Sequence, residues 1–369
     1  MSSHLPALDG LRALAVAGVC WFHWAPRHQF GLPWASGVSL FFVISGFLIT
    51  GILLDRRSES IATTLRHFYA RRSLRIFPLF YLTLAVAALL NVPLVREHLG
   101  WHVLYLSNFL TALEHVRTGP LQHFWSLSVE EQFYLVWPLL MLFTPSRGLP
   151  WLIVGTILSA PAFKLFMALK HPEIEDASML PFSCLDTLGI GALLAWLSRR
   201  SAGLSVLSVA RIMGGIGFPL TLLLGIYRAA IGQDLPLWLD CWRNVAIGFF
   251  FGWLVVELAR GGLGRVGRTL QSKPLIYLGK ISYGLYVFHM FAPLIVDSVR
   301  AGLGWAGRLA LPVQIVTYAG LTFTLAALSW HCFEAPINRL KRFFPYHREP
   351  QMAQSEIRPA ANASPLKSC

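Results

Sequence analysis

The sequence alternates between long apolar segments and short polar ones. Ten apolar segments have roughly the length, about 20 residues, that a helix needs to cross the hydrocarbon core of a bilayer. We therefore expect an all-α polytopic integral membrane protein with about ten transmembrane helices. The ten segments lie at approximately 8–25, 35–54, 76–95, 124–143, 151–169, 184–198, 212–229, 243–259, 275–295 and 311–332.

Basic residues predict the orientation of these helices. With a cytoplasmic amino terminus, the segments on the cytoplasmic side hold 20 of the 31 Lys and Arg residues, against six in the outer loops. Such an excess is typical of multi-pass membrane proteins. Ten crossings place both termini in the cytoplasm and residues 96–123 in an outer loop, in which residues 101–110 would lie in the interface or re-enter the membrane. The sequence leaves open whether residues 98–113 span the membrane or lie in the interface. The cytoplasmic segments are 55–75, 144–150, 199–211, 260–274 and the chain from residue 334.

Composition agrees with a membrane setting. Hydrophobic residues make up 55% of the chain and charged residues only 13%, and the mean hydropathy is +0.56, outside the range of ordinary soluble domains. The net charge of +13 does not indicate a nucleic-acid partner, because the basic residues form short clusters and no continuous basic face. The five cysteines show no metal-ligand spacing, so we expect no metal site. We interpret residues 1–345 as a transmembrane domain and the polar residues 346–369 as a disordered cytoplasmic tail.

The first apolar segment, ALDGLRALAVAGVCWFHW, contains an arginine and a histidine. Arg12 and His23 are eleven residues apart, about three helical turns, so they point the same way and lie roughly 16 Å apart along the axis. One polar stripe would then serve both ends of a tunnel. An equally weighted alternative is that Arg12 reaches the cytoplasmic interface and His23 is solvated at the outer end.

Two adjacent carboxylates open the segment in HFWSLSVEEQFYLVWPLLML, residues 123–142. Ser128 and Glu131 have the spacing of a capping box, which would occupy Glu131 at the start of a helix. Glu130 points to another face, shared with Tyr134 and Trp137. We therefore expect Glu130 to be the carboxylate available for chemistry. The competing interpretation is a charge that favours the helix dipole.

A cluster of arginines lies in the run RHFYARRSLRIFP. Arg72 and Arg75 are three residues apart with Arg71 beside them, and guanidinium groups at this spacing can grip phosphates. The alternative is that they only anchor the cytoplasmic side. In the segment before them, GVSLFFVISGFLITGILL, glycines and Ser45 would allow close approach of another helix or a slender ligand, and helix packing is the commoner use.

The ninth segment, LGKISYGLYVFHMFAP, is unusually polar for a lipid-facing helix. Tyr286 and His289 are three residues apart and would share a face, which indicates a wet interior rather than exposure to lipid. In HCFEAPINRLKRFF we interpret Glu334 as a helix end before Pro336, followed by a basic anchor at the membrane surface.

Six of these stretches, in this order and spacing, resemble the acyltransferase 3 family of membrane-bound O-acyltransferases, which includes O-antigen and exopolysaccharide acetylases. The resemblance extends to about residue 340. It rests on LDGLRALAVAGVCWFHW, GVSLFFVISGFLIT, RRSLRIFP, HFWSLSVEEQFYLVWPLL, LGKISYGLYVFH and FEAPINR.

The resemblance implies an O-acetyltransferase in a bacterial inner membrane that moves an acyl group, usually acetyl from acetyl-CoA, onto a hydroxyl of an extracytoplasmic sugar or polysaccharide. It also implies site residues. The family's arginine and histidine fall on Arg12 and His23, its RxxR pair on Arg72 and Arg75, and its carboxylate on Glu130.

These residues suggest a mechanism. The acyl-CoA phosphates would bind Arg71, Arg72 and Arg75, His23 would be the general base, and Glu130 would orient the imidazole if the fold brings the two together. The sequence also allows a multi-span transporter or flippase of a polar envelope precursor, or a glycosyltransferase, and it leaves the oligomeric state open.

Overall fold

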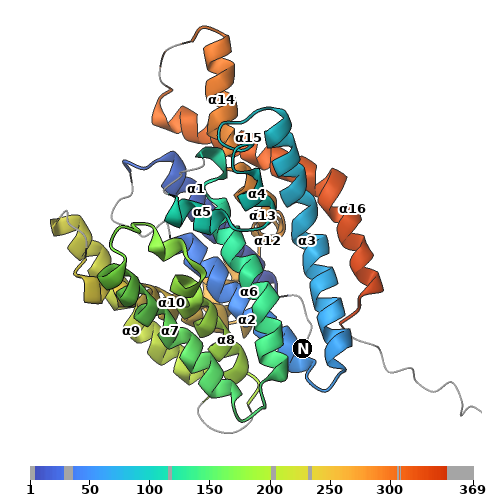
Figure 1. Cartoon of the computed structure of the whole chain (residues 1–369), viewed down its shortest axis with the longest axis vertical. Helices are drawn as coiled ribbons and strands as arrows, with labels where there is room; N and C mark the ends of the chain where they lie inside the picture. The colour runs from blue at the N-terminus through green and yellow to red at the C-terminus, as the bar shows by residue number, and fades with distance from the viewer. Residues whose placement is uncertain are drawn as a thin grey trace, which may run out of the picture.

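The computed structural model describes residues 5–28, 36–114, 119–200, 205–231, 235–305, 307 and 309–346. Every regular element among them is a helix (Figure 1), which confirms the predicted all-α class. The predicted disordered tail, apart from its first residue Tyr346, lies outside the described residues.

Six helical stretches in this part of the chain are long and apolar enough to cross a membrane, and the chain is a multi-pass membrane protein. The total of about ten crossings and the cytoplasmic location of both termini stay predictions. The six stretches are Gly37–Asp55 (α2), Ile61–Leu89 (α3), Leu149–Lys170 (α7), Val206–Arg228 within α9 (Val206–Ile231), Leu237–Ala259 (α10) and Leu311–Phe343. The last comprises α15 (Leu311–Ser329), the π-helical turn η5 (Trp330–Glu334), α16 (Ala335–Asn338) and η6 (Arg339–Phe343).

The other helices fill the space between these stretches. Two of them, α1 (Pro6–Trp24) and α6 (Phe124–Phe143), are about as long as a span. The rest are shorter: α4 (Leu99–Val103), α5 (Ser107–Leu113), η2 (Gly119–Leu121), η3 (Ala177–Met179), η4 (Pro181–Cys184), α8 (Leu185–Leu197), α11 (Gly264–Leu270), α12 (Lys273–Lys280), α13 (Ser282–Phe288) and α14 (Phe291–Gly302).

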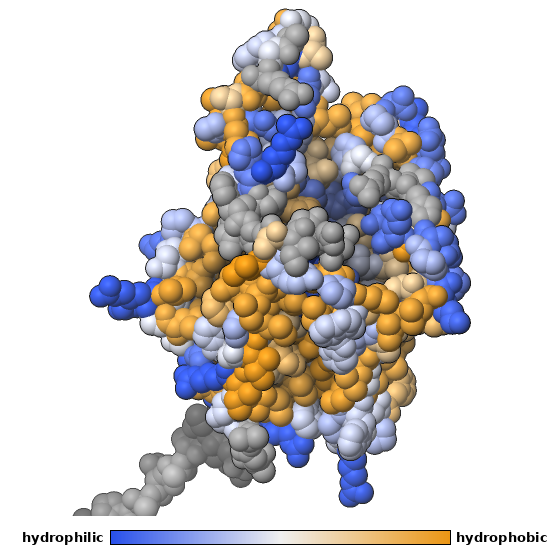
Figure 2. Space-filling view, turned by 90° about the vertical axis from the view of Figure 1, so that its left-hand side faces the viewer, coloured by the Kyte–Doolittle hydropathy of each residue, from blue (hydrophilic) through white to orange (hydrophobic). Residues whose placement is uncertain are grey.

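The helices form two groups with the site elements between them. In Figure 1, α7, α8, α9 and α10 lie together on one side, α3 and α16 lie on the other, and α2 and α6 lie between. The closest packing joins α2 to α8 and α9 to α10, while α1 packs on α12. Orange, apolar residues form a broad area over the lower middle of the face in Figure 2, and blue residues lie mainly along its edges.

Glycines set the approach of α2 and α8. A Cβ atom on Gly46 would overlap the carbonyl oxygen of Leu188, and one on Gly191 would overlap that of Val43. Each helix therefore places a glycine against the backbone of the other, so that the two backbones touch. Helix packing is thus the use of Gly46.

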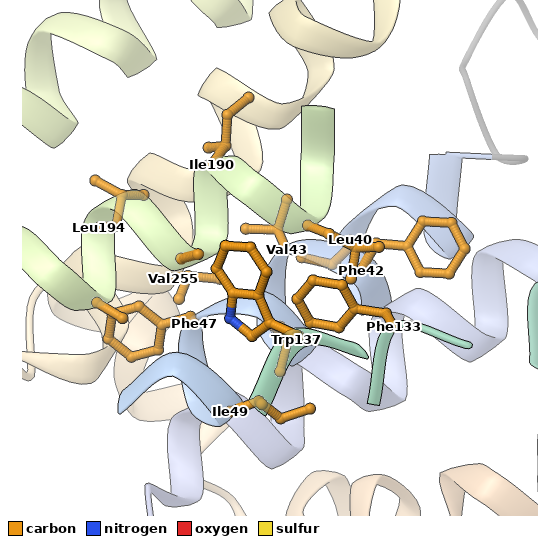
Figure 3. Close-up of a cluster of buried hydrophobic side chains, with 14 of the residues drawn as sticks. Leu40, Phe42, Val43, Phe47, Ile49, Phe133, Trp137, Ile190, Leu194 and Val255 are labelled. Carbon is orange, nitrogen blue, oxygen red and sulfur yellow. The ribbon is translucent and has the colours of Figure 1, made fainter. Parts of the chain in front are cut away.

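A buried aromatic cluster holds α6 against α2. The rings of Trp137 and Phe133 stack with centroids 5.1 Å apart, surrounded by aliphatic side chains of α2, α8 and α10 (Figure 3). The indole N–H of Trp137 donates to the hydroxyl of Thr50 at 2.8 Å, which supplies the partner that a buried indole requires.

The prediction of one continuous helix at 275–295 is wrong. The chain breaks after Lys280 and again at His289 and Met290, giving α12, α13 and α14. A hydropathy pattern gives the length of an apolar segment but not its continuity. The short helix α12 is held by direct backbone contact with α1. A Cβ atom on Gly279 of α12 would overlap the carbonyl oxygen of Asp9 on α1.

Residues 98–113 do not form a single spanning helix. They fold into the short helices α4 and α5. The side-chain amides of Asn108 on α5 and Gln132 on α6 exchange two hydrogen bonds of 3.1 Å, and Gln132 also donates to the carbonyl of Tyr105 at 2.8 Å. The segment is thereby fixed against α6, next to the site.

Candidate functional site

A cavity of about 120 Å³ lies between α1, α2, α3, α6 and α13. Its charged side chains come from three separate regions of the sequence, and each was a predicted site residue. Polar and aromatic groups complete the wall. The charged residues are Arg12, Arg72, Arg75 and Glu130, and the remaining lining residues include Ser45, Ser126, Tyr134, Ser282, Tyr283 and Tyr286.

One face of α6 forms a wall of the cavity. Ser126, Glu130 and Tyr134 lie at intervals of four residues and all line it, as expected for side chains on one helical face. The predicted capping box is wrong. Because α6 already begins at Phe124, Ser128 lies inside the helix and its hydroxyl donates to the carbonyl of Phe124 at 3.1 Å.

Glu130 is tied to α2 by a short hydrogen bond. The hydroxyl of Ser45 donates to its Oε1 at 2.5 Å and lies 3.0 Å from the hydroxyl of Tyr134. Ser45, Glu130 and Tyr134 therefore form one polar group across the α2–α6 contact. The prediction that Glu130 shares a face with Tyr134 is confirmed.

The three cavity arginines differ in how far they are neutralised. Arg12 pairs with Asp9 at 3.3 Å, one turn away on α1. Arg75 lies 3.6 Å from the buried carboxylate of Glu334 and donates to the carbonyl of Lys280 at 2.9 Å. Since Glu334 belongs to η5 and the chain continues into α16, the interpretation of Glu334 as a helix end is wrong.

Arg72 differs from the other two cavity arginines, because no described carboxylate forms an ion pair with it, although Glu130 and Glu131 interact with it electrostatically. Its guanidinium lies 5.1 Å from the centre of the Tyr134 ring and 5.8 Å from that of Phe68. It makes no hydrogen bond or ion pair with another described residue. Arg72 therefore offers its donors to an incoming anion.

The structure does not place Arg71 in the cavity. Its guanidinium donates to the carbonyls of Lys341 and Phe344 at 3.0 and 3.1 Å and lies 4.3 Å from the centre of the Tyr346 ring. The physical reason is helical: α3 begins at Ile61, so neighbouring residues on it point about 100° apart. Arg72 and Arg75 share a face that Arg71 does not.

His23 lies near the C-terminal end of α1, eleven residues after Arg12, and it does not line the cavity. Its Nδ1 lies 2.9 Å from the carbonyl of Val19 and 3.2 Å from Nε2 of His289. Among the described residues, no contact joins it to Glu130. Glu130 lies nearly two turns inside α6, and its partners are Ser45 and Tyr134. The expected contact between the imidazole and this carboxylate is thus replaced by one between two imidazoles.

Tyr286 connects the cavity to a cluster of three histidines. Its hydroxyl lies 2.5 Å from that of Ser126 and donates to the carbonyl of His123 at 3.1 Å. The His289 ring lies with its centroid 4.9 Å from that of His23 and 4.6 Å from that of His123. Tyr286 and Ser126 line the cavity, so they form the wall between it and the cluster.

Sequence reasoning missed the roles of Ser45, His123 and Ser126. A sequence signal existed for Tyr286 and His289, whose spacing of three predicted a shared wet face. For Ser45 and Ser126 the local pattern carries no signal, because their partners lie 85 and 160 residues away in the chain.

Comparison with known proteins identifies the family of the chain. The acyltransferase family described as "Acyltransferase domain" matches residues 5–331. The chain is 29% identical over 363 residues to the O-acetyltransferase OatA of Staphylococcus aureus, covering 91% of this chain and 57% of the relative. It is 26% identical over 371 residues to the peptidoglycan O-acetyltransferase OatA of Listeria monocytogenes, covering 91% of this chain and 56% of the relative.

The chain thus spans less than two thirds of the length of these relatives. No solved structure matches it. Because the family match covers most of the sequence and includes α1, α3 and α6 with their cavity residues, the chain belongs to the acyltransferase 3 family.

Proposed function

We propose that the protein is a membrane-bound O-acetyltransferase that moves an acetyl group from cytoplasmic acetyl-CoA to a hydroxyl of an extracytoplasmic carbohydrate. Family membership supports the reaction class. The name of the Staphylococcus aureus relative supports O-acetyl transfer, and that of the Listeria monocytogenes relative supports peptidoglycan as the acceptor. The observation that carries the proposal is the convergence of Arg12, Arg72 and Arg75 on one cavity.

The arginine cavity fits an anionic group of the donor. Its volume of about 120 Å³ is below the range of about 300–1,000 Å³ for pockets that enclose a whole small molecule. It has room for phosphate groups of the donor rather than for an entire nucleotide. Arg72 and Arg12 would hold the phosphates, and Arg75, already paired with Glu334, would add positive charge.

His23 would be the general base for the acceptor. It lies roughly 16 Å along α1 from Arg12, beyond the wall that Ser126 and Tyr286 form. A donor held by its phosphates at the arginines would need an extended arm that passes these two side chains to reach the histidine. The acceptor oxygen would attack the thioester carbonyl while His23 takes the hydroxyl proton. The new C–O bond forms, the C–S bond breaks, and the proton passes from the imidazolium to the departing thiolate.

Glu130 has a different task in this arrangement from the one the sequence suggested. It fixes Ser45 and Tyr134 and places a negative charge beside the arginines. This limits how strongly the cavity attracts an anion, which favours release of the spent donor after transfer.

The donor site is tested by binding of acetyl-CoA and of CoA to the full chain in nanodiscs. Arg72→Gln is the informative variant, because Arg72 has no ion pair to break among the described residues, whereas Arg75→Gln would strand Glu334. We expect the affinity for both nucleotides to fall about ten-fold or more. Arg200→Gln is the matched control, since Arg200 lies over the Trp196 ring away from the cavity.

Transfer is tested with acetyl-CoA labelled in the acetyl carbon and peptidoglycan fragments as the acceptor probe, in membranes that contain the protein. Label should appear on the carbohydrate as a base-labile ester, and His23→Ala should abolish it while leaving acetyl-CoA binding intact. If folded wild-type protein binds neither acetyl-CoA nor CoA, the acyl-CoA donor is wrong. Binding without label transfer would overturn the acceptor class.

A further inference from the structure

The end of α13 fixes the protonation of His289. α13 stops at Phe288 and His289 follows it, which leaves the last carbonyls of the helix without helical partners. One of them, the carbonyl of Tyr286, lies 2.5 Å from Nδ1 of His289. A carbonyl only accepts hydrogen bonds, so Nδ1 carries the proton. Nε2 of His289 is therefore left with its lone pair as an acceptor.

The acceptor on His289 acts together with a backbone carbonyl on the protonation of His23. Nδ1 of His23 faces two acceptors, the carbonyl of Val19 at 2.9 Å and Nε2 of His289 at 3.2 Å. A proton on Nδ1 satisfies both, whereas a lone pair there would face two other lone pairs. His23 is thus neutral with its proton on Nδ1, and its Nε2 is the basic nitrogen.

We infer that His289 is a positioning residue that holds His23 in the Nδ1–H tautomer and leaves Nε2 of His23 as the base. The chemical use of that base rests on the proposed function, but the tautomer does not. When His23 takes a proton on Nε2, its Nδ1–H still donates to His289 and Val19. The imidazole of His289 thus orients His23 in the way that a carboxylate orients the histidine of a catalytic triad.

The backbone at His289 is held independently of its imidazole. The indole N–H of Trp24 donates to the carbonyl of His289 at 2.8 Å, and the His289 side chain is fully buried. Because Trp24 lies one residue after His23 on α1, the same helix holds both the histidine and the backbone of its partner. Substitution of the His289 side chain therefore leaves this backbone contact in place.

The competing explanation is that His289 only caps α13. Two substitutions separate the roles. An asparagine amide reaches about as far as Nδ1 and can still donate to the carbonyl of Tyr286, but it presents no acceptor to His23. A glutamine amide reaches about as far as Nε2 and can present its oxygen there. His289→Asn thus keeps the cap and removes the acceptor, while His289→Gln restores the acceptor.

The test is histidine-labelled NMR of the full chain in nanodiscs, with His23 assigned by its loss in His23→Gln. Wild type and His289→Gln should show His23 predominantly as Nδ1–H. In His289→Asn the ratio of Nδ1–H to Nε2–H should fall about five-fold, as expected for the loss of one ordinary hydrogen bond. His331→Gln, which removes an exposed imidazole stacked on Tyr277, should leave the ratio unchanged.

Activity provides the second measurement. The turnover of acetyl transfer should fall about ten-fold in His289→Asn with the donor affinity unchanged, and His289→Gln should recover most of it. An Nε2–H tautomer of His23 in wild type, or the same ratio in wild type and His289→Asn, would overturn the inference. The NMR result does not depend on acyl transfer, so failure of the proposed function is distinguished from failure of the positioning role.

Discussion

The hydroxyl of Ser45 on α2 donates a 2.5 Å hydrogen bond to the carboxylate of Glu130 on α6, at the wall of a cavity that also contains Arg12 and Arg72. The carboxylate is therefore held in a defined position next to the proposed anion site. There it competes with an incoming phosphate for the positive charge of the arginines.

This position predicts opposite effects of Glu130→Gln on binding and on turnover. Removal of one negative charge beside the arginines should tighten acetyl-CoA binding about five-fold, equivalent to about 1 kcal/mol at an intermediate effective dielectric. Turnover should fall about ten-fold, because a glutamine fixes Ser45 and Tyr134 less firmly than a charged acceptor does. Calorimetric titration and acetyl transfer measure the two quantities.

Glu131→Gln is the matched control, since Glu131 is adjacent in sequence but does not line the cavity. It should change donor affinity less than two-fold. Weaker binding of acetyl-CoA to Glu130→Gln would show that the carboxylate supports the anion site rather than opposing it.

Local pattern predicted the parts of the site that depend on a single helix. The shared face of Arg72 and Arg75 and the face of Glu130 and Tyr134 follow from the 3.6-residue repeat, whereas the stripe of Arg12 and His23 stays a prediction, because only Arg12 lines the cavity. Even so, the same repeat excludes Arg71 from that face once α3 is known to begin at Ile61. Once the helix is known to include the whole motif, Arg71 can be separated from Arg72 and Arg75, although it is adjacent in sequence.

The contacts that could not be predicted join different helices, and they depend on how far those helices are shifted along their axes relative to one another. The start of α6 at Phe124 moves Glu130 into the helix, toward the arginines and Ser45. The break before α14 places His289, rather than a carboxylate, against His23. Such contacts join residues up to 266 positions apart, and neither hydropathy nor local periodicity fixes them.

The glycine contacts between α2 and α8 predict a clear loss of stability. In Gly46→Ala and Gly191→Ala the new methyl group would overlap a backbone carbonyl of the other helix, and overpacking of this kind typically costs about 1–3 kcal/mol. Thermal unfolding in a fixed detergent should show a lower midpoint for each variant.

Gly155→Ala provides the matched control for these variants. Gly155 lies within α7, and a Cβ atom there meets nothing within 4 Å. Alanine in a helix interior is favoured over glycine by up to about 1 kcal/mol, so this variant should unfold at the same or a higher temperature. Equal midpoints for Gly46→Ala and Gly155→Ala would contradict the close approach of α2 and α8.

A buried ion pair joins α7 to α8, and we expect the stability of the protein to depend on both of its partners. Nζ of Lys164 lies 2.6 Å from Oδ2 of Asp186, whose side chain is fully buried. Lys164→Met alone would leave an uncompensated buried carboxylate and should destabilise the protein by about 3–5 kcal/mol. The double variant Lys164→Met with Asp186→Leu should recover most of that loss, as measured by denaturant unfolding.

The pair of Arg300 and Asp297, 3.2 Å apart and with the aspartate side chain 60% exposed, is the comparison for the buried pair. Asp297→Asn should change the unfolding free energy by less than about 1 kcal/mol. A double variant at Lys164 and Asp186 no more stable than the single one would show that the pair contributes directional contacts that apolar packing cannot replace.

His102 predicts a specific pH dependence of stability. It lies on α4, outside the six candidate spans, and its Nδ1 lies 2.8 Å from the hydroxyl of Ser107. Burial, with a smaller contribution from the charge of His98, lowers the pKa of His102 from its ordinary value of 6.5 to about 4. The folded protein therefore keeps this imidazole neutral at pH values at which the unfolded chain protonates it.

The sign of the effect follows from these two pKa values. Between pH 6.5 and pH 4 the unfolded state binds the extra proton, so stability falls as the pH falls through this window, by up to about 3 kcal/mol. Above pH 6.5 His102 does not make the unfolding free energy depend on pH. In His102→Gln this component should be absent, so the difference in unfolding free energy between wild type and variant should itself vary with pH from 6.5 down to 4. A difference that is constant over this range would show that His102 remains accessible to protons in the folded state.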